Sequence, residues 1–383
     1  MSYLEKLLEG VEVEWKPLGE VAELYGGLKG KSKADFEKGN SKYISYKNIF
    51  NNIEVDFENL EYVNVSSNEN QYEVKYGDVL FTGSSEIAEE SGMSSSVTTN
   101  SNEKVYLNSF SFGVRFNEGI VLKPEFTKYL FRSNFMRNEI AKTASGVTRY
   151  NVSKERFKKL QIPIPPIEIQ QKIVAILDTF TELTAELTAE LTARKSQYTY
   201  YREKLLSFDE NQVEWKTLGE VLTIKNGKDY KSFKVGDIPV YGSGGVMTYI
   251  DTPIFEKPSV LIPRKGSLGN LFYVDFPFWT VDTLFWTDIN ITVVLPKYVY
   301  YYLQTQKLAD LNMAGGVPSL TQTILNKVKI PIPPLSEQER IVSILDQFDT
   351  LTTSITEGLP KEIELRKKQY EYYRDMLLSF PKN

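Results

Sequence analysis

The stretch IPIPPIEIQQKIVAILDTF occupies residues 162–180, and a close copy, IPIPPLSEQERIVSILDQF, occupies residues 330–348. Two further pairs keep the same order along the chain. VEWKPLGEV at 13–21 recurs as VEWKTLGEV at 213–221, and QYTYYREKLLSF at 197–208 recurs as QYEYYRDMLLSF at 369–380. Repetition at a spacing of about half the chain predicts a two-fold duplication rather than a solenoid of many short repeats.

The two IPIPP segments predict the starts of two long helices. Each follows a pair of prolines, which favour a helix start, and then carries apolar residues at spacings of three and four. The first helix is predicted over about 168–207, or roughly 60 Å. Its apolar stripe needs a partner, and the second copy, packed antiparallel as a coiled coil, supplies one. In that copy Gly358 and Pro360 predict a break.

A four-residue repeat, TELTAELTAELTA at 181–193, lies inside the first predicted helix. One interpretation is helix filler, because Ala, Leu and Glu are strong helix formers. The other is a length module, because one added unit lengthens a helix by about 6 Å.

The segments between the repeats diverge and read as α+β. Short β-type segments begin at residues 43, 76 and 108 in the first half and at 238, 258 and 280 in the second, and an aromatic-rich helix follows each set, at 124–141 and from residue 296. We therefore predict two globular domains separated by two long helices in a pseudo-two-fold, cyclic arrangement. The predicted boundaries are an N-terminal helical segment at 1–12 beside the C-terminal helix, a first domain at 13–161, a central helix at 162–212, a second domain at 213–329 and a C-terminal helical region at 330–383.

Composition excludes several kinds of site. The 383 residues include no His and no Cys, which removes the usual zinc ligands and the Ser-His-Asp and Cys-His nucleophilic systems. We expect no metal site. The absence of a signal peptide or a long apolar run leads us to expect a cytoplasmic protein.

Charge is unevenly distributed around the net value of −5. Residues 54–103 carry 11 acids and one base, whereas residues 104–160 carry 12 bases and four acids. The basic run is either ordinary solvated surface or a face that contacts phosphates.

Taken together, the duplicated VEWK openings, the IPIPP helix starts, the YYR helix ends and the two divergent domains resemble the specificity subunits of type I restriction-modification systems over essentially the whole chain. The resemblance implies that each divergent domain is a target-recognition domain, which reads one half of an asymmetric bipartite site in double-stranded DNA. It implies that the helices set the gap between the half-sites and bind two methyltransferase subunits, which modify adenine, and that restriction subunits join them. S-adenosylmethionine is then expected on the partner methyltransferase and no cofactor in this chain. The alternative is a coiled-coil interaction scaffold with two domains that bind protein or carbohydrate.

No catalytic residues are expected. An adenine methyltransferase needs a polar residue before a Pro-Pro pair and an aromatic after it, whereas here Ile164 and Ile332 precede the pairs, and Ile167 and Leu335 follow them.

For DNA contact we favour Lys, Arg, Tyr, Ser, Thr, Asn and Gln in loops at the ends of β-type segments. For each of these residues, the alternative is an ordinary solvated loop residue. The candidates in the first domain are Lys29, Lys31, Lys33, Tyr46, Lys47, Asn48, Ser84, Ser85, Thr148, Arg149 and Tyr150. Those in the second domain are Lys228, Lys231, Tyr241, Ser243, Arg264, Lys265, Ser267, Asn270, Ser319 and Gln322.

Overall fold

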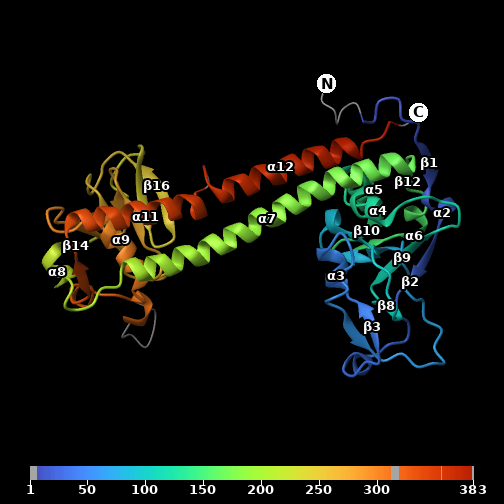
Figure 1. Cartoon of the computed structure of the whole chain (residues 1–383), viewed down its shortest axis with the longest axis horizontal. Helices are drawn as coiled ribbons and strands as arrows, with labels where there is room; N and C mark the ends of the chain where they lie inside the picture. The colour runs from blue at the N-terminus through green and yellow to red at the C-terminus, as the bar shows by residue number, and fades with distance from the viewer. Residues whose placement is uncertain (1–6, 312–318, 355, 382–383) are drawn as a thin grey trace. The chain divides into compact units, whose positions relative to one another are not determined.

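The computed structural model describes residues 7–311, 319–354 and 356–381, and the chain divides into two compact units (Figure 1). Unit 1 comprises residues 1–185 and 364–383, and unit 2 comprises residues 186–363. Half of the N-terminal segment predicted at 1–12 lies outside the described residues. Residues 7–10 form a turn, and Leu7 and Leu8 pack partly buried against the core of unit 1.

Unit 1 is a mixed α+β fold whose described strands form small sheets. The four-stranded sheet has the order β2 (Ala22–Gly26), β9 (Ser111–Phe116), β5 (Val79–Thr82) and β7 (Ser94–Ser96). One three-stranded sheet has the order β4 (Glu61–Val63), β3 (Ser41–Ile44) and β8 (Val105–Leu107). The other has the order β10 (Ala144–Ser145), β11 (Tyr150–Val152) and β6 (Ser84–Ser85). The two ends of the domain pair as β1 (Glu14–Pro17) and β12 (Gln161–Ile164). Its short helices are α2 (Leu18–Val21), η1 (Lys33–Phe36), α3 (Tyr46–Asn51), η2 (Ala88–Glu90), α4 (Pro124–Leu130), α5 (Asn134–Ala141) and α6 (Lys154–Phe157).

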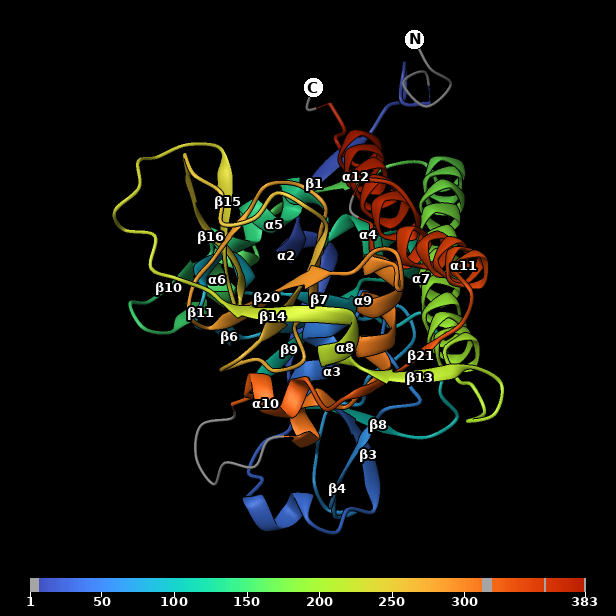
Figure 2. The ribbon, with the colours of Figure 1, turned by 90° about the vertical axis from the view of Figure 1, so that its left-hand side faces the viewer.

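Unit 2 repeats this topology. Its four-stranded sheet has the order β14 (Leu222–Asn226), β20 (Leu284–Ile289), β17 (Ser259–Pro263) and β18 (Phe272–Val274). The three-stranded sheet is β16 (Gly245–Ile250), β15 (Ile238–Gly242), β19 (Trp279–Thr280), and the ends pair as β13 (Glu214–Thr217) and β21 (Lys329–Ile332). The short helices of unit 2 are α8 (Leu218–Val221), α9 (Pro296–Thr305), η3 (Leu308–Leu311) and α10 (Gln322–Leu325). Helix α9 lies between the four-stranded sheet and α11 (Leu335–Thr353) (Figure 2). The predicted α+β duplication is confirmed.

Two local predictions are right only in part. The segment that begins at Tyr43 is β3 only as far as Ile44, because Ser45 caps α3 by accepting a hydrogen bond from the amide of Asn48 (3.4 Å). The helix predicted at 124–141 is broken in two, because Ser133 caps α5 in the same way through the amide of Met136.

The long helices agree closely with the sequence. Helix α7 (Ile167–Leu205) runs for 39 residues, and α12 (Leu359–Leu377) follows the predicted break, where Gly358 has a φ of +81°. In unit 1, α7 packs antiparallel against α12, with the rings of Phe180 and Tyr373 stacked 5.4 Å apart (Figure 1). In unit 2 its later turns pack against α11, where the ring of Tyr198 stacks on Phe348 at 6.1 Å. No helix in the described part of the chain is long and apolar enough to cross a membrane.

A fully buried glutamine ties each long helix to its domain. The amide oxygen of Gln170 in α7 accepts from the backbone N–H of Lys123 (2.9 Å), and its amide nitrogen donates to the carbonyls of Val121 and Pro165 (both 2.8 Å). Gln338 in α11 makes the same three bonds, with the amide of Leu295 (2.9 Å) and the carbonyls of Val293 and Pro333. We call each arrangement a glutamine clasp. It joins the proline segment, the helix and the loop before α4 or α9 at one point.

A carboxylate two turns later makes a second repeated tie. Asp178 accepts a hydrogen bond from the hydroxyl of Tyr129 (2.5 Å) and pairs with Lys128 (3.1 Å). Asp346 accepts from Tyr301 (2.5 Å) and pairs with Lys297 (2.7 Å). Burial, reinforced by the bond to the carboxylate, raises the pKa of both tyrosines far above the ordinary value, so both hydroxyls remain donors at any physiological pH.

Replacing a clasp glutamine by leucine tests how much these ties contribute. In Gln170→Leu the buried partners of the amide lose their bonds, and the free energy of unfolding should fall by about 2–4 kcal/mol. The measurement is guanidinium unfolding, combined with hydrogen exchange of residues 119–124.

The matched control is Gln171→Leu, because the neighbouring side chain is exposed. It should leave the denaturation midpoint nearly unchanged. Equal midpoints for the two variants would contradict a structural role of the clasp.

Candidate nucleic-acid interface

Three predicted residues of unit 1 meet at one place. The hydroxyl of Tyr46, at the start of α3, donates to the carbonyl of Ser84 in β6 (2.9 Å), and the guanidinium Nε of Arg149 donates to the hydroxyl of Ser84 (3.0 Å). Ser84 is buried, whereas Arg149 is exposed. We call Tyr46, Ser84 and Arg149 the unit 1 cluster. It brings together segments that lie far apart in the sequence.

The loop that carries Arg149 is held tightly at its base. Strand β11 pairs Tyr150 with Ser85 and so joins the loop to β6. A Cβ atom at Gly146 would collide with the carbonyl oxygen of Arg149, so only glycine allows this close approach. Thr148 lies exposed in the loop, whereas Ser85 is buried and accepts a hydrogen bond from the amide of Ile87 (3.2 Å).

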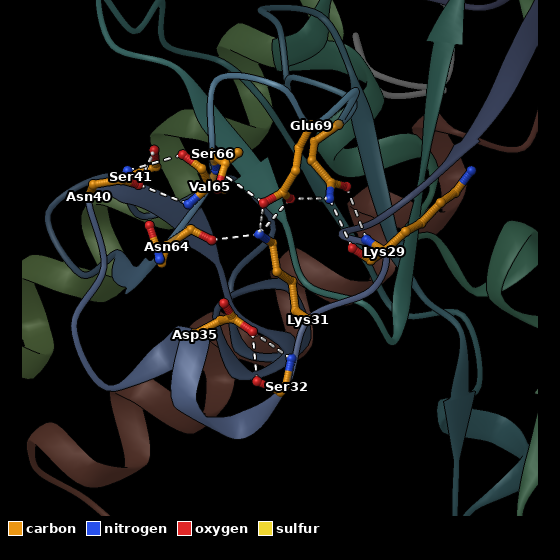
Figure 3. A network of polar contacts seen from close by, with 11 residues as sticks. Lys29, Lys31, Ser32, Asp35, Asn40, Ser41, Asn64, Val65, Ser66 and Glu69 are labelled. Carbon is orange, nitrogen blue, oxygen red and sulfur yellow. Dashed lines mark hydrogen bonds and ion pairs between the residues drawn. The ribbon is translucent and has the colours of Figure 1, made fainter.

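Lys29 and Lys31 lie in a separate network of polar contacts (Figure 3). The ammonium group of Lys31 contacts the carboxylate of Glu69 at 2.5 Å and donates to the carbonyl of Asn64 (2.6 Å), and only 3% of its side chain is exposed. Hydrogen bonds from Lys31 first, then from Gln71 and Ser66, lower the pKa of Glu69 to about 2. The carboxylate is therefore charged at neutral pH, and the ion pair fixes the loop.

The other lysines of this region are exposed, and the ammonium group of Lys29 lies 5.9 Å from the centre of the Tyr72 ring. Lys29 is exposed and binds the side chain of Gln71 through its backbone, while Lys33 is exposed at the start of η1. In α3, Lys47 is exposed, but Asn48 is buried and its amide donates to the carbonyls of Asp56 (2.8 Å) and Asn59 (3.3 Å). The polar groups of Lys31 and Asn48 are thus used inside the fold.

Unit 2 places a second group around Thr283. The hydroxyl of Thr283 accepts from the amide of Ser243 (3.2 Å), and its carbonyl accepts from the amide of Arg264 (2.9 Å). The side chain of Asn270 donates to the carbonyl of Ser243 (3.1 Å), and Lys265 pairs with Ser319 in an isolated bridge. We call Ser243, Arg264, Lys265 and Asn270 the unit 2 cluster. Lys265 and Asn270 are exposed.

The remaining candidates of unit 2 lie in different surroundings. Lys231 and Ser243 line the same surface hollow, together with Asp229 and Asp282. Tyr241 packs against Phe272, with ring centres 5.6 Å apart, as a partly buried residue of the core. The rest lie outside the cluster: Lys228 and Ser267 are exposed, and Gln322 begins α10.

The two clusters occupy the same position in the repeat, as backbone hydrogen bonds show. In unit 1, Gly83 donates to the carbonyl of Phe110 (2.8 Å) and accepts from Val152 (2.9 Å). In unit 2, Arg264 donates to Thr283 and accepts from Leu320 (2.8 Å) in the same way. Sequence reasoning missed Phe110 and Thr283, because equivalent turns of such different sequence carry no repeated motif.

Part of the basic run at 104–160 is buried rather than exposed. Two of its arginines, Arg132 and Arg137, are largely enclosed, and burial lowers the pKa of each to about 10. Arg132 donates to the carbonyls of Ile49 (2.8 Å), Phe50 (3.0 Å) and Asn52 (3.1 Å) at the end of α3. Its charge therefore stabilises the end of the helix that begins with Tyr46.

The chemistry of both clusters suits a polyanion that also offers hydrogen-bonding edges. Exposed Arg and Lys bind phosphates, while Asn and Arg also match base edges. Among the described residues, no group of acidic side chains is arranged to hold a metal ion.

Comparisons with known proteins give one consistent answer. The family described as "Type I restriction modification DNA specificity domain" matches residues 10–194 and again 210–365. A putative type I restriction enzyme specificity subunit of Haemophilus influenzae is 35% identical, over 99% of this chain and 98% of its own length. A type I restriction enzyme specificity subunit of Escherichia coli is also 35% identical, over 100% and 98%.

Solved structures agree on the fold. The S subunit of a type I restriction-modification system from M. genitalium aligns over 100% of both chains with a TM-score of 0.55 at 19% identity. A type I restriction-modification structure concerned with complex assembly and conformational transition covers 96% of this chain and 97% of its own, with a TM-score of 0.65 at 20% identity. The duplicated fold and the two matched domains establish that this chain belongs to the family of type I restriction-modification specificity subunits.

Proposed function

We propose that the chain is a non-catalytic subunit that recognises an asymmetric bipartite DNA site, with one half read by each unit. The observation that carries this proposal is the pair of clusters at equivalent positions of the repeat. One consists of Tyr46, Ser84 and Arg149, and the other consists of Ser243, Arg264, Lys265 and Asn270. Because the frame is shared and the side chains differ, the two units should prefer different base sequences.

The exposure of the candidates divides them into contacting and supporting residues. Arg149, Lys47, Lys33, Lys265 and Asn270 are exposed and can reach a phosphate or a base edge. Lys31, Asn48 and Ser84 are used by the fold and are proposed to hold those side chains in place.

Catalysis is proposed to belong to partner subunits. The long helices would position two adenine methyltransferase subunits, which bring S-adenosylmethionine, and restriction subunits would join that assembly. Membership of the family supports these partners. A methylation assay therefore needs the reconstituted complex rather than this chain alone.

Single cation substitutions should affect one half-site each. Arg149→Ala should weaken binding by about 1–3 kcal/mol and relax the preference in one half, and Lys265→Ala should do the same in the other half. The measurements are mobility shifts and methylation of the reconstituted complex on DNA with either half-site randomised. Lys368→Ala is the control, because this exposed lysine lies in α12, outside both clusters, and its ammonium group pairs with Glu364 at 2.5 Å.

Two outcomes would refute the proposal. One is an identical effect of both substitutions on both half-sites. The other is binding insensitive to salt, because release of counterions from DNA requires a steep salt dependence. Salt-insensitive binding of a protein or carbohydrate would favour the scaffold alternative.

Lys31 and Lys33 should behave differently although they lie two residues apart. Lys31→Met leaves Glu69 without its cation, so amide exchange of residues 27–40 and 64–71 should become faster in the free protein. Lys33→Met removes an exposed charge, so exchange should stay unchanged while the salt slope of DNA binding falls by about one. Faster exchange in both variants, or in neither, would contradict this division of roles.

The repeat at 181–193 is proposed to set the gap between half-sites. It lies within the continuous helix α7, where its leucines are half-buried. Deleting one ELTA unit shortens the helix by about 6 Å and should shorten the unspecified spacer by about one or two base pairs, at about 3.4 Å each. Methylome sequencing reads the spacer directly. An unchanged spacer would leave the repeat as helix filler.

A further inference from the structure

Phe110 is an exposed aromatic residue at the turn between β8 and β9. Its side chain is 67% exposed, and among the phenylalanines that the structure describes only Phe276, at 43%, is also exposed. Isolated exposed apolar residues are common and need no explanation by themselves. The surroundings of Phe110 are what set it apart.

The backbone of this turn is rigidly held. The buried side chain of Asn108 accepts hydrogen bonds from the amide of Phe110 (3.0 Å) and the hydroxyl of Ser111 (3.1 Å), and it donates to the carbonyl of Ile44 (3.0 Å). A Cβ atom at Gly27 would collide with the carbonyl of Asn108, so the neighbouring loop closes on this turn without a side chain between them. The ring of Phe110 is therefore presented to solvent from a fixed base.

The turn also joins the unit 1 cluster. The carbonyl of Phe110 accepts from the amide of Gly83 (2.8 Å), and a Cβ atom at Gly83 would lie 2.7 Å from that same oxygen. Gly83 precedes Ser84, which holds both Tyr46 and Arg149. The turn that carries this apolar ring is thus bonded through its backbone to the segment that carries the unit 1 cluster.

The equivalent residue of unit 2 is polar. Thr283 occupies the place of Phe110, and its hydroxyl is already used by the amide of Ser243. A short, satisfied side chain cannot enter a stack of bases. Any apolar insertion at this point of the repeat is therefore confined to unit 1.

Resting on the proposed function, we propose that Phe110 inserts as an apolar wedge at one base step of the half-site read by unit 1 and partly unstacks it. Phenylalanine is among the side chains that proteins insert between base steps. A rigid turn suits this role, because a wedge supported by a mobile loop would yield instead of separating the bases. The half-site read by unit 2 should stay stacked at the equivalent step.

The test uses 2-aminopurine, whose fluorescence rises when it is unstacked. It replaces single adenines on either strand of the half-site, except the methylated adenines, which the methyltransferase extrudes independently of this residue. Binding by the full reconstituted complex should raise the fluorescence several-fold at one position. Permanganate reactivity should report unstacked thymines at the same step.

Phe110→Ala should abolish this signal and weaken binding about tenfold, whereas Phe110→Leu should keep most of both. Phe276→Ala is the matched control, because it removes the other exposed phenylalanine and should leave the signal unchanged. A signal that is absent, or that persists in Phe110→Ala, would overturn the proposal. The proposal would also be overturned if Phe110 only packed against the 5-methyl group of a thymine. In that case, replacing this thymine by uracil would weaken wild-type binding as much as Phe110→Ala does, and Phe110→Ala would weaken binding to the uracil-containing DNA no further.

The wild-type complex separates this inference from the proposed function. If it binds no specific DNA, the proposed function fails. If it binds specifically in a bipartite manner but no base unstacks through Phe110, only the wedge fails.

Discussion

The glutamine clasp is the interaction on which the rest of the structure depends. Gln170 and Gln338 are fully buried, and each satisfies one backbone amide and two carbonyls that no helix or strand could pair. Proline makes this necessary, because β12 and β21 end just before a Pro-Pro pair that has no N–H groups with which to continue the ladder. A single side chain therefore ties the start of a long helix to the end of each domain. The repetition of the clasp explains why this stretch changes so little between the two halves.

The sequences of the two halves differ most in segments that neither the glutamine clasps nor the carboxylate ties contact. Asp178 and Asp346 hold α4 and α9 against the long helices, and the paired ends β1–β12 and β13–β21 close each domain. The turns that carry the clusters are instead held through backbone hydrogen bonds. Backbone bonds do not depend on side-chain identity, so Gly83 and Arg264 can occupy one position. The frame can thus accept different side chains in these turns without losing its fold.

Sequence periodicity predicts the helical frame well because helices are local. Helix α7 lies within two residues of its expected ends, and the break before α12 follows from Gly358. The candidate site is less predictable, because burial depends on contacts between distant segments. The sequence favours Lys31 as a phosphate ligand, but in the structure its ammonium group is paired with Glu69. Arg132 belongs to a run of basic residues, but its guanidinium group binds carbonyls at the end of α3. Phe110 carries no sequence signal at all.

Rigidity of the clusters has a consequence for binding. A protein that orders loops on its partner loses affinity to conformational entropy, by about 0.5–1.5 kcal/mol for each side chain that becomes immobile. Here the turn of Phe110 is fixed by Asn108, and Ser84 is fixed between Tyr46 and Arg149 before any partner arrives. A chain with a net charge of −5 has little long-range attraction for DNA to offset such losses. The proposed binding of DNA would therefore rest on preorganised turns rather than on a strongly basic surface.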